Sequence, residues 1–236
     1  MWHKIKSFIK VLLGKEIFIK KDLKTHLQWF GNKHAGFYLN PDFINESSIV
    51  YSFGVGTDIS FDEELISKFD CTVFGFDPTP KTIHYITNYS QLPQKYIFEP
   101  YGLYSHDGTI EFLLPENSNH VSCTVGNLRN YDDEKLNKVV VPVFKFESIL
   151  KKLGHSKIDV LKLDIEGSEY EVLEDILNAR IQINQICIEF HHRFKGVSKQ
   201  KTKHAIKRLR ESGYKLIGVS AQAEEYTFIN SNYINC

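Results

Sequence analysis

The sequence lacks the features that mark several special classes of protein. Lys+Arg and Asp+Glu both number 29, so the formal net charge is +0 and no basic excess indicates a nucleic-acid partner. No apolar run approaches the ~20 residues that a membrane-spanning helix needs. The four cysteines are scattered without a Cys-x-x-Cys pair, and Cys71 and Cys187 lie in apolar runs. We therefore expect buried, reduced thiols and a cytoplasmic protein.

Apart from these absences, the composition is that of an ordinary globular protein. With 236 residues, 42% hydrophobic and 25% charged, the chain can bury a full core. Short β-branched runs alternate with amphipathic stretches, which predicts an α/β fold with a doubly wound, mostly parallel sheet. Expected strands are 49–53, 72–76, 96–99, 139–144, 158–163, 185–190, 214–219 and 226–229, the last two forming an antiparallel hairpin.

Residues 1–30 differ from the rest, and we expect them to be a basic, amphipathic helical extension of a domain spanning residues 31–236. The usual layout of a signal peptide is missing there. Two interpretations remain: the helix packs on the domain or on a second subunit, or it rests on an anionic membrane surface. Its two faces consist of apolar residues (Trp2, Ile5, Phe8, Ile9, Leu12, Leu13) and lysines (Lys4, Lys6, Lys10, Lys15).

A glycine turn follows the first strand of the expected sheet. The strand 49–53 leads into Gly54-Val55-Gly56-Thr57-Asp58, and a helix begins near Ser60, which forms a capping box with Glu63. A strand, a glycine turn and a helix N-terminus in this order are typical of a site for a nucleotide-like cofactor. The alternative is an ordinary turn without a ligand.

The identity of the cofactor depends on two positions. A dinucleotide-binding fingerprint needs a third glycine where this chain has Ile59, which argues against an NAD enzyme. Asp77 ends the second strand, twenty-one residues after Gly56 and directly before Pro78, where a carboxylate can bind both ribose hydroxyls. Two glycines and a ribose acid favour S-adenosylmethionine.

The next segments supply further contacts. Tyr101-Gly102-Leu103 stands at the third strand-to-helix junction, where we expect contact with an adenine. Asp107-Gly108 predicts a hairpin between residues 101–104 and 109–113. Residues 115–138 are polar and read as a long loop, which is either a substrate lid or a segment without function.

Polar residues cluster after the strand 158–163. Asp164 and Glu166 fall at the carboxyl end of this strand, where open parallel sheets bind ligands. Lys162 shares a face with Asp164 and needs a carboxylate partner, either in a structural ion pair or in an active site. Ser168 with Glu171 predicts a helix cap, and we attribute Glu169 and Glu171 to the helix dipole.

The end of the strand 185–190 carries a second pair of polar residues. Glu189 and His191 share a face, so the carboxylate can orient the imidazole and raise its basicity. His191 is our candidate for the base that a hydroxyl acceptor of a methyl group requires, and a surface histidine is the alternative. We assign no dedicated metal ligands, although a variant puts a divalent metal between Asp164 and the Glu189/His191 strand end.

Four segments together resemble the signature of FkbM-type methyltransferases. They are Leu161-Lys162-Leu163-Asp164-Ile165-Glu166-Gly167-Ser168-Glu169, residues 146–150, the Asp107-Gly108 turn and Ile188-Glu189-Phe190-His191. The resemblance covers about residues 47–230. It implies a class I, Rossmann-like methyltransferase fold and S-adenosylmethionine as donor. Ser52 stands where relatives usually have an acid, so Asp58 is expected to take over the donor's ammonium, and Glu147 replaces a usual aspartate.

The sequence therefore predicts an S-adenosylmethionine-dependent O-methyltransferase. The acceptor class that the resemblance implies is a sugar or glycan hydroxyl, or a small hydroxylated natural product. A catalytically silent binding module with the same fold is the rival. The catalytic set is His191, Glu189, Asp164 and Lys162; the cofactor set is Gly54, Val55, Gly56, Thr57, Asp58, Asp77, Pro78, Tyr101, Gly102, Leu103, Asp164 and Glu166.

Overall fold

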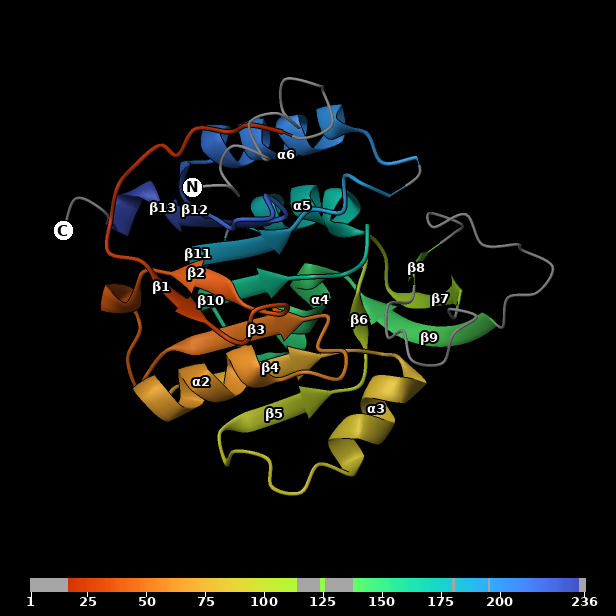
Figure 1. Cartoon of the computed structure of the whole chain (residues 1–236). Coiled ribbons are helices and arrows are strands. Elements are labelled where there is room, and N and C mark those ends of the chain that lie inside the picture. Colours follow the sequence, from red (N-terminus) through yellow and green to blue (C-terminus); the bar gives the residue numbers. More distant parts are fainter. Residues whose placement is uncertain (1–16, 114–123, 126–137, 180, 195, 234–236) are drawn as a thin grey trace.

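The computed structural model describes residues 17–113, 124–125, 138–179, 181–194 and 196–233. Residues 1–16 of the expected amphipathic helix and most of the expected loop at 115–138 lie outside these residues. A seven-stranded sheet forms the centre of the described chain, in the order β12-β13-β11-β10-β3-β4-β5 (Figure 1). Its strands are β3 (Ile49–Phe53), β4 (Thr72–Phe76), β5 (Tyr96–Glu99), β10 (Lys157–Leu163), β11 (Gln182–Glu189), β12 (Tyr214–Val219) and β13 (Glu225–Asn230).

The sheet has the expected mixed topology. β5, β4, β3, β10 and β11 pair in parallel, while β13 pairs antiparallel with both β11 and β12. The order of the parallel strands reverses beside β3, because β4 follows on one side and β10 lies on the other. A reversal of this kind opens a crevice at the carboxyl ends of the strands. The predicted α/β class, parallel sheet and C-terminal hairpin are confirmed.

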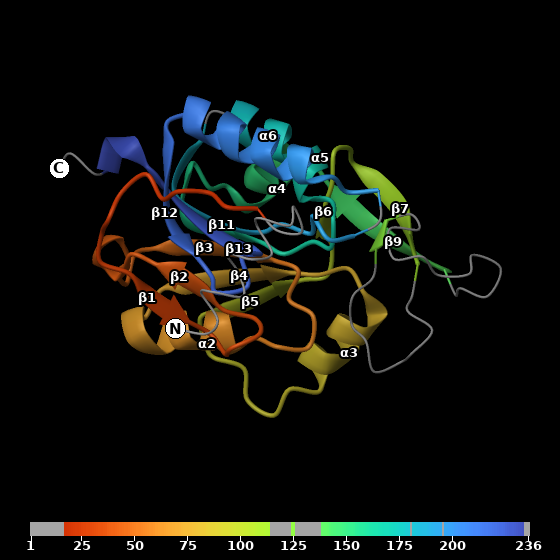
Figure 2. The same cartoon turned by 45° about the horizontal axis from the view of Figure 1, so that its top comes forward.

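Two layers cover the faces of this sheet (Figures 1 and 2). The helices α4 (Phe146–Leu153), α5 (Glu169–Asn178) and α6 (Lys199–Glu211) bury one apolar core with the sheet. The helix α2 (Ser60–Phe69) and the ribbon of β1 (Gln28–Phe30) and β2 (Phe37–Leu39) bury a second core on the other face. The chain also contains the helix α3 (Pro80–Thr87) between β4 and β5 and the 3-10 turn η1 (Pro41–Phe43) between β2 and β3, and the 3-10 turn η3 (Ser231–Tyr233) follows β13.

A small second sheet stands beside the central one, in the order β6-β9-β7-β8. Its strands are β6 (Gly102–Leu103), β7 (Gly108–Leu113), β8 (Thr124–Val125) and β9 (Lys138–Phe144). The predicted hairpin at Asp107-Gly108 is wrong, because β9 lies between β6 and β7 and pairs with both. Asp107 instead accepts hydrogen bonds from the Lys145 N–H and the Ser148 hydroxyl, both at 2.7 Å, and so caps α4.

The described part of the expected N-terminal extension is not helical. Residues 17–27 have no regular secondary structure, and β1 follows, with Phe30 fully buried. Arg210 binds Asp22 with two nitrogens at 2.9 Å, and Asp22 also accepts the Leu216 N–H. These contacts tie residues 17–30 to α6 and β12, so the predicted helix does not extend into them. Among the described helices, none has the length and apolarity to cross a bilayer.

Two local predictions at helix starts are wrong. Ser60 forms no capping box, since its hydroxyl accepts the Asn32 N–H and Asp58 accepts the Ser60 N–H. Ser168 likewise makes no side-chain cap. At Ser60 a tertiary contact with Asn32 takes the hydroxyl that the local motif would have used. The predicted burial of Cys71 and Cys187 is confirmed, and both thiols are free.

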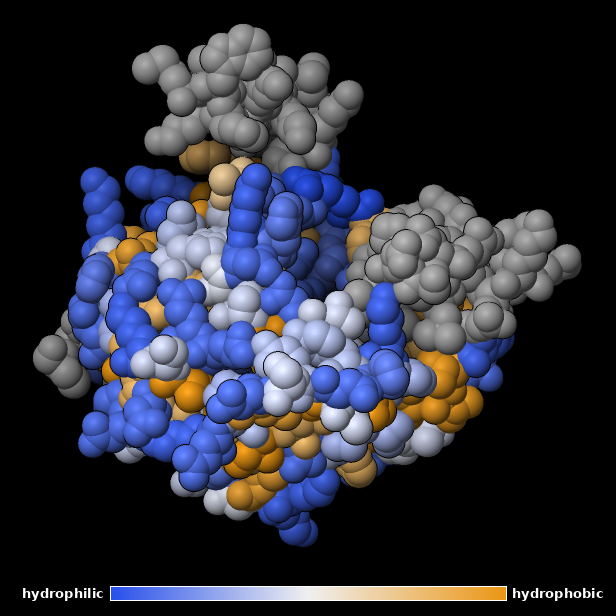
Figure 3. All heavy atoms as spheres, turned by 60° about the horizontal axis from the view of Figure 1, so that its bottom comes forward, coloured by the Kyte–Doolittle hydropathy of each residue, from blue (hydrophilic) through white to orange (hydrophobic). Residues whose placement is uncertain are grey.

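The surface of the described chain is mixed in character. Figure 3 shows hydrophobic side chains in groups separated by hydrophilic ones on the face that lies below in Figure 1. The large hydrophobic side chains that are exposed among the described residues are Phe18, Ile97 and Val140. Single exposed hydrophobic residues are normal in globular proteins. The polar groups around the cavity at the sheet's carboxyl edge are more informative about function.

Candidate functional site

A cavity of about 560 Å³ opens where β3, β4, β10 and β11 end. It lies at the reversal of strand order, where α/β sheets bind their ligands. The cavity brings together almost the whole predicted site. The predicted residues that line it are Gly54, Val55, Gly56, Thr57, Asp58, Asp77, Pro78, Gly102, Leu103, Asp164, Glu166, Glu189 and His191. Lys162 and Tyr101 are the two predicted residues that do not line it.

The glycine turn after β3 packs directly on the end of β10. Gly54 has a φ of +80°, and a Cβ there would stand 1.7 Å from the backbone oxygen of Asp164. The Gly54 N–H also donates to the Phe76 oxygen at 3.0 Å. Only glycine fits both this backbone conformation and this closeness. The backbone of the turn is therefore held against the end of β10, at the edge of the cavity.

Asp77 connects the glycine turn to the end of β4. Its Oδ2 accepts the Gly56 N–H at 3.0 Å, and its Oδ1 accepts the N–H and hydroxyl of Thr79. Asp77 is buried, and burial raises the pKa of its carboxyl group despite these hydrogen bonds. A carboxylate oxygen has two acceptor sites, so Oδ1 is filled by Thr79 and Oδ2 keeps one site for a ligand hydroxyl.

Asp58 lies at the end of the glycine turn, just before α2. Its carboxylate accepts hydrogen bonds from the side-chain amide of Asn32, in the β1–β2 connection, and from the Ser60 N–H. It lines the cavity and is partly exposed. Its role toward the ammonium of a donor stays a prediction.

Lys162 lies below the cavity floor. Its ammonium donates to the Gly54 oxygen at 3.0 Å and stands 3.9 Å from Asp164 Oδ2, and the side chain is 6% exposed. The predicted carboxylate partner is thus present, and of the two interpretations the contacts favour the structural ion pair. Tyr101 packs edge-on against Phe144, with the Lys152 ammonium over its ring, and it does not line the cavity.

The turn between β10 and α5 presents two carboxylates to the cavity. Glu166 adopts a left-handed backbone with a φ of +54°, which is costly for a residue other than glycine. Glu169 holds this turn in place, because its carboxylate accepts the N–H groups of Ile165 and Gly167 at 3.0–3.2 Å. Strain of this kind persists where surrounding contacts fix it, and it concentrates at functional sites.

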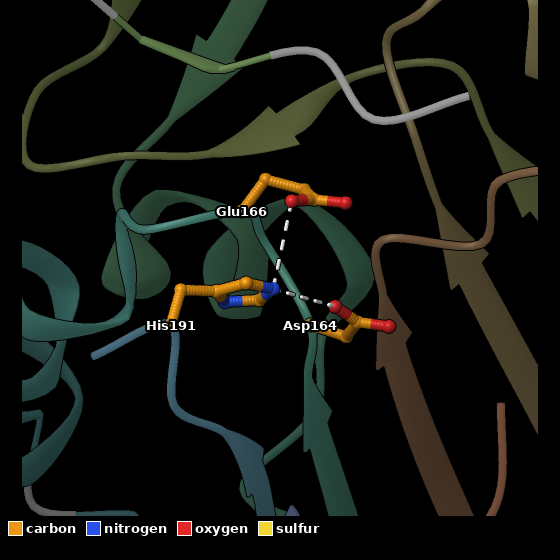
Figure 4. Close-up of side chains that lie close together, drawn as sticks. All are labelled: Asp164, Glu166 and His191. Carbon is orange, nitrogen blue, oxygen red and sulfur yellow. Dashed lines mark ion pairs between the residues drawn. The ribbon is translucent and has the colours of Figure 1, made fainter. Parts of the chain in front are cut away.

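His191 faces this turn from the end of β11 (Figure 4). Its Nδ1 donates to Glu169 Oε1 at 2.9 Å, since a carboxylate is an acceptor only. Its Nε2 points at three further carboxylates: Glu166 Oε2 at 3.5 Å, Glu189 Oε1 at 3.7 Å and Asp164 Oδ1 at 3.8 Å. The acid that orients the ring is therefore Glu169, and the expectation that Glu189 does so is wrong.

The electrostatics of this cluster are unusual. Burial alone would lower the pKa of His191, but the carboxylates of Glu169, Glu166 and Asp164 raise it well above 6.5. Burial and the neighbouring Asp164 raise the pKa of Glu189 far above its ordinary value. The cluster thus concentrates negative charge in a partly buried space and binds protons or cations to balance it.

Several residues of the site were not predicted from the sequence, because their local pattern carries only a weak signal. Glu169 is fully buried at the start of α5, where the helix dipole is by itself a sufficient reason for an acid. The Phe194 ring lies 4.7 Å from the His191 ring and closes the cavity beside it. His34 and Glu224 also line the cavity, from connections far apart in the sequence. Only the folded chain brings these side chains together.

Comparisons with known proteins agree with this geometry. The methyltransferase FkbM domain matches residues 48–216. The probable methyltransferase-like protein 24 of Homo sapiens is 29% identical over 174 residues, which is 73% of this chain and 40% of that protein. The hexuronic acid methyltransferase AglP of Haloferax volcanii is 28% identical over 141 residues, 58% of this chain and 54% of AglP. The chain thus spans about half the length, or less, of these relatives.

Solved structures are similar at a greater distance. The fibrillarin pre-rRNA processing protein of Methanococcus jannaschii gives a TM-score of 0.48 at 12% identity, covering 91% of this chain and 86% of that chain. The fibrillarin of Aeropyrum pernix, solved with S-adenosyl-L-methionine, gives a TM-score of 0.42 at 12% identity, covering 79% and 66%.

Proposed function

Since this chain belongs to the FkbM methyltransferase domain family, we propose that it is an S-adenosylmethionine-dependent O-methyltransferase. The acceptor is a hydroxyl group of a sugar, a glycan or a small hydroxylated molecule. One observation carries the proposal: the glycine turn and the carboxylate–imidazole cluster line the same cavity, so a donor on the first faces an acceptor on the second.

The donor occupies the side of the cavity formed by β3, β4 and β6. A ribose hydroxyl of the donor binds the free acceptor site of Asp77 Oδ2, and the adenine lies between Pro78 and the backbone of Gly102 and Leu103. The amino-acid end rests on the glycine turn, with its ammonium toward Asp58. This arrangement directs the sulfonium methyl group toward the ends of β10 and β11.

The acceptor hydroxyl lies at the cluster of Asp164, Glu166, Glu189 and His191. As its oxygen attacks the methyl carbon, the O–CH₃ bond forms, the S–CH₃ bond breaks and S-adenosylhomocysteine leaves. The hydroxyl proton passes to a group at the cluster, with His191 Nε2 as the candidate base. A ring that already carries a proton cannot take another, so this role requires that positive charge on the ligands offset the surrounding carboxylates.

A uronic-acid glycan is the acceptor to test first. The relative AglP is named as a hexuronic acid methyltransferase. Hydroxyl groups of a sugar suit a wall of carboxylates, because each carboxylate accepts several hydrogen bonds from them. The apolar side chains of Ile110, Phe112 and Phe194 line the same cavity and can pack on a sugar ring.

Calorimetric titration with S-adenosylhomocysteine, with NAD as comparator, tests the donor. We expect micromolar binding of the first alone, and a loss of at least tenfold in affinity in Asp77→Asn. Asp70→Asn is the matched control, because Asp70 is an exposed aspartate with a left-handed backbone outside the cavity. Equal losses in both variants would contradict the role of Asp77.

Transfer of a labelled methyl group to uronic-acid oligosaccharides tests the acceptor, with hexose oligosaccharides and a catechol as comparators. Product on the uronic acids at a rate well above the comparators is expected. Donor binding without transfer to any of these acceptors would favour the rival interpretation, a silent binding module with the same fold.

A further inference from the structure

The cluster around His191 Nε2 has the composition and spacing of a cation site. Candidate ligand atoms of Asp164, Glu166 and His191 all lie within 4.8 Å of one another (Figure 4). Ligands about 2.1 Å from an octahedral ion stand about 3 Å apart in cis and about 4.2 Å in trans. The Nε2 distances of 3.5 Å to Glu166 and 3.8 Å to Asp164 fall inside that range.

The state of His191 points independently to a ligand. The imidazole is 7% exposed, and Nδ1 is held by Glu169, so the ring cannot turn Nε2 away from the cluster. Among the described residues, no carboxylate lies within the usual ~3.2 Å limit of an N–H···O hydrogen bond to Nε2, although three surround it. The buried Nε2 thus points at three carboxylate oxygens that lie beyond the usual distance of a hydrogen bond.

The contact with Glu169 is the support that metal-binding histidines generally have. Such a histidine usually donates its second ring N–H to a carboxylate, which fixes the tautomer and makes the other nitrogen a better ligand. Here Glu169 is fully buried and also holds the Glu166 turn through Ile165 and Gly167. One side chain therefore positions two of the candidate ligands.

We propose that Asp164, Glu166 and His191 bind a divalent cation, with Glu189 available as a fourth ligand, and that this cation holds two neighbouring oxygens of the acceptor. The part of this proposal that concerns the acceptor rests on the proposed function. The binding of the ion itself does not. One imidazole among carboxylates suits Mn²⁺ better than Ca²⁺ or Mg²⁺, which prefer oxygen ligands alone.

The cation also explains how a pocket so rich in carboxylates would accept an acidic sugar. A uronate brought against Asp164, Glu166 and Glu189 without a cation would meet strong repulsion. With the ion bound, vicinal oxygens of the sugar complete its coordination. His191 is then a ligand rather than the base, and a hydroxyl on the cation has a lowered pKa, so its proton can pass to water.

The test uses the full chain after dialysis against EDTA, with Mn²⁺ as the probe and no donor or acceptor present. Loss of the electron paramagnetic resonance signal of free Mn²⁺ measures binding. We expect one ion per chain, with affinity at least tenfold weaker in Glu166→Gln, Asp164→Asn and His191→Ala. Electron spin echo modulation from a coordinated ¹⁴N is expected in the native chain and not in His191→Ala.

Asp42→Asn is the matched control, because Asp42 forms an exposed pair with His26 at 2.9 Å, far from the cavity. Unchanged melting temperatures of the variants exclude loss of folding as the cause. Absence of binding at millimolar Mn²⁺, or equal binding by all variants, would overturn the site. Ion binding without transfer to uronic acids would support the site and count against the proposed acceptor. Undiminished transfer after complete chelation would refute the role of the ion in holding the acceptor.

Discussion

Glu169 Oε1 lies 2.9 Å from His191 Nδ1, and the same carboxylate accepts the N–H groups of Ile165 and Gly167. A single buried acid therefore joins the end of β11 to the turn that follows β10. Because Glu166 and His191 both depend on this carboxylate, the geometry of the cluster is set by a residue that does not itself line the cavity. Glu169 is a positioning residue, and its effect can be separated from that of the helix dipole.

Substitution Glu169→Gln is expected to lower the rate of methyl transfer by about 10–100-fold, with little change in donor affinity. An amide has one acceptor oxygen and cannot receive His191 and both backbone groups. Glu171→Gln is the control, since Glu171 lies in the same first turn of α5 and experiences the same dipole. Steady-state kinetics measure the rate of methyl transfer, and S-adenosylhomocysteine titration measures the affinity of the donor site. Equal effects of the two substitutions would show that the dipole explanation was sufficient.

The contact of Gly54 with Asp164 leads to a second prediction. In Gly54→Ala, the new Cβ would stand 1.7 Å from the Asp164 oxygen, so the turn or the end of β10 must move. We expect a loss of donor binding and a lower free energy of unfolding, by more than the ~1 kcal/mol that strained backbone alone costs. Urea unfolding and donor titration measure both effects.

Gly154→Ala separates the two causes of that loss. Gly154 has a similar φ of +73°, but a Cβ there meets nothing within 4 Å. It should therefore show the backbone cost alone and bind the donor normally. Comparable unfolding free energies for the two variants would argue against the close approach of Gly54 and Asp164.

Asp107, where the predicted hairpin is wrong, provides a prediction about stability. Its carboxylate caps α4 through the Lys145 N–H and the Ser148 hydroxyl, and these bonds lower its pKa. Asp107→Ala should lower the free energy of unfolding by about 1 kcal/mol at neutral pH, and Asp107→Asn by less.

The pH dependence of that effect has a definite sign. Because the folded pKa of Asp107 is depressed, its contribution is present above the unfolded pKa near 4 and is lost as the pH falls through the folded value. Urea unfolding of Asp107→Ala and the native chain at several pH values measures the difference. A difference that stays constant down to pH 2 would contradict the charged cap.

The elements that the sequence predicted well are those defined by local pattern. β-branched apolar runs identified strands such as Ile49–Phe53 and Thr72–Phe76 to the residue. Since parallel strands end at one edge of the sheet, Asp77, Asp164 and His191 could then be placed at one site without knowledge of their distances. The glycine turn added the position of the helix that follows it.

The predictions that failed depended on partners far away in the sequence. Asp107-Gly108 does reverse the chain, but the strand that lies between β6 and β7 is β9, about thirty residues later. The Ser60 hydroxyl is bound by Asn32, which no helix-capping rule includes. The burial of Glu169 depends on β11 bringing His191 to the turn. A local motif shows which hydrogen bonds a residue is able to form. The tertiary structure decides which of those hydrogen bonds it does form.

Asp62, in the first turn of α2, carries the last prediction. Its carboxyl is 2% exposed, and burial raises its pKa to about 6, while the Lys162 ammonium opposes the rise and Asp58 and Glu63 add to it. A raised folded pKa means that the folded chain keeps this proton after the unfolded chain has lost it. The unfolding free energy therefore falls as the pH rises from about 4 to about 6, and this contribution is constant above.

In Asp62→Asn this contribution disappears, because the amide does not titrate. The unfolding free energy of the variant, relative to the native chain, should rise between pH 4 and pH 6 by an amount on the order of 3 kcal/mol, since each pKa unit is worth about 1.4 kcal/mol. All other titrating groups are shared and cancel in the difference. Urea unfolding at closely spaced pH values measures it, and parallel curves for the two proteins would mean that Asp62 is ionised throughout, held by Lys162 as a full ion pair.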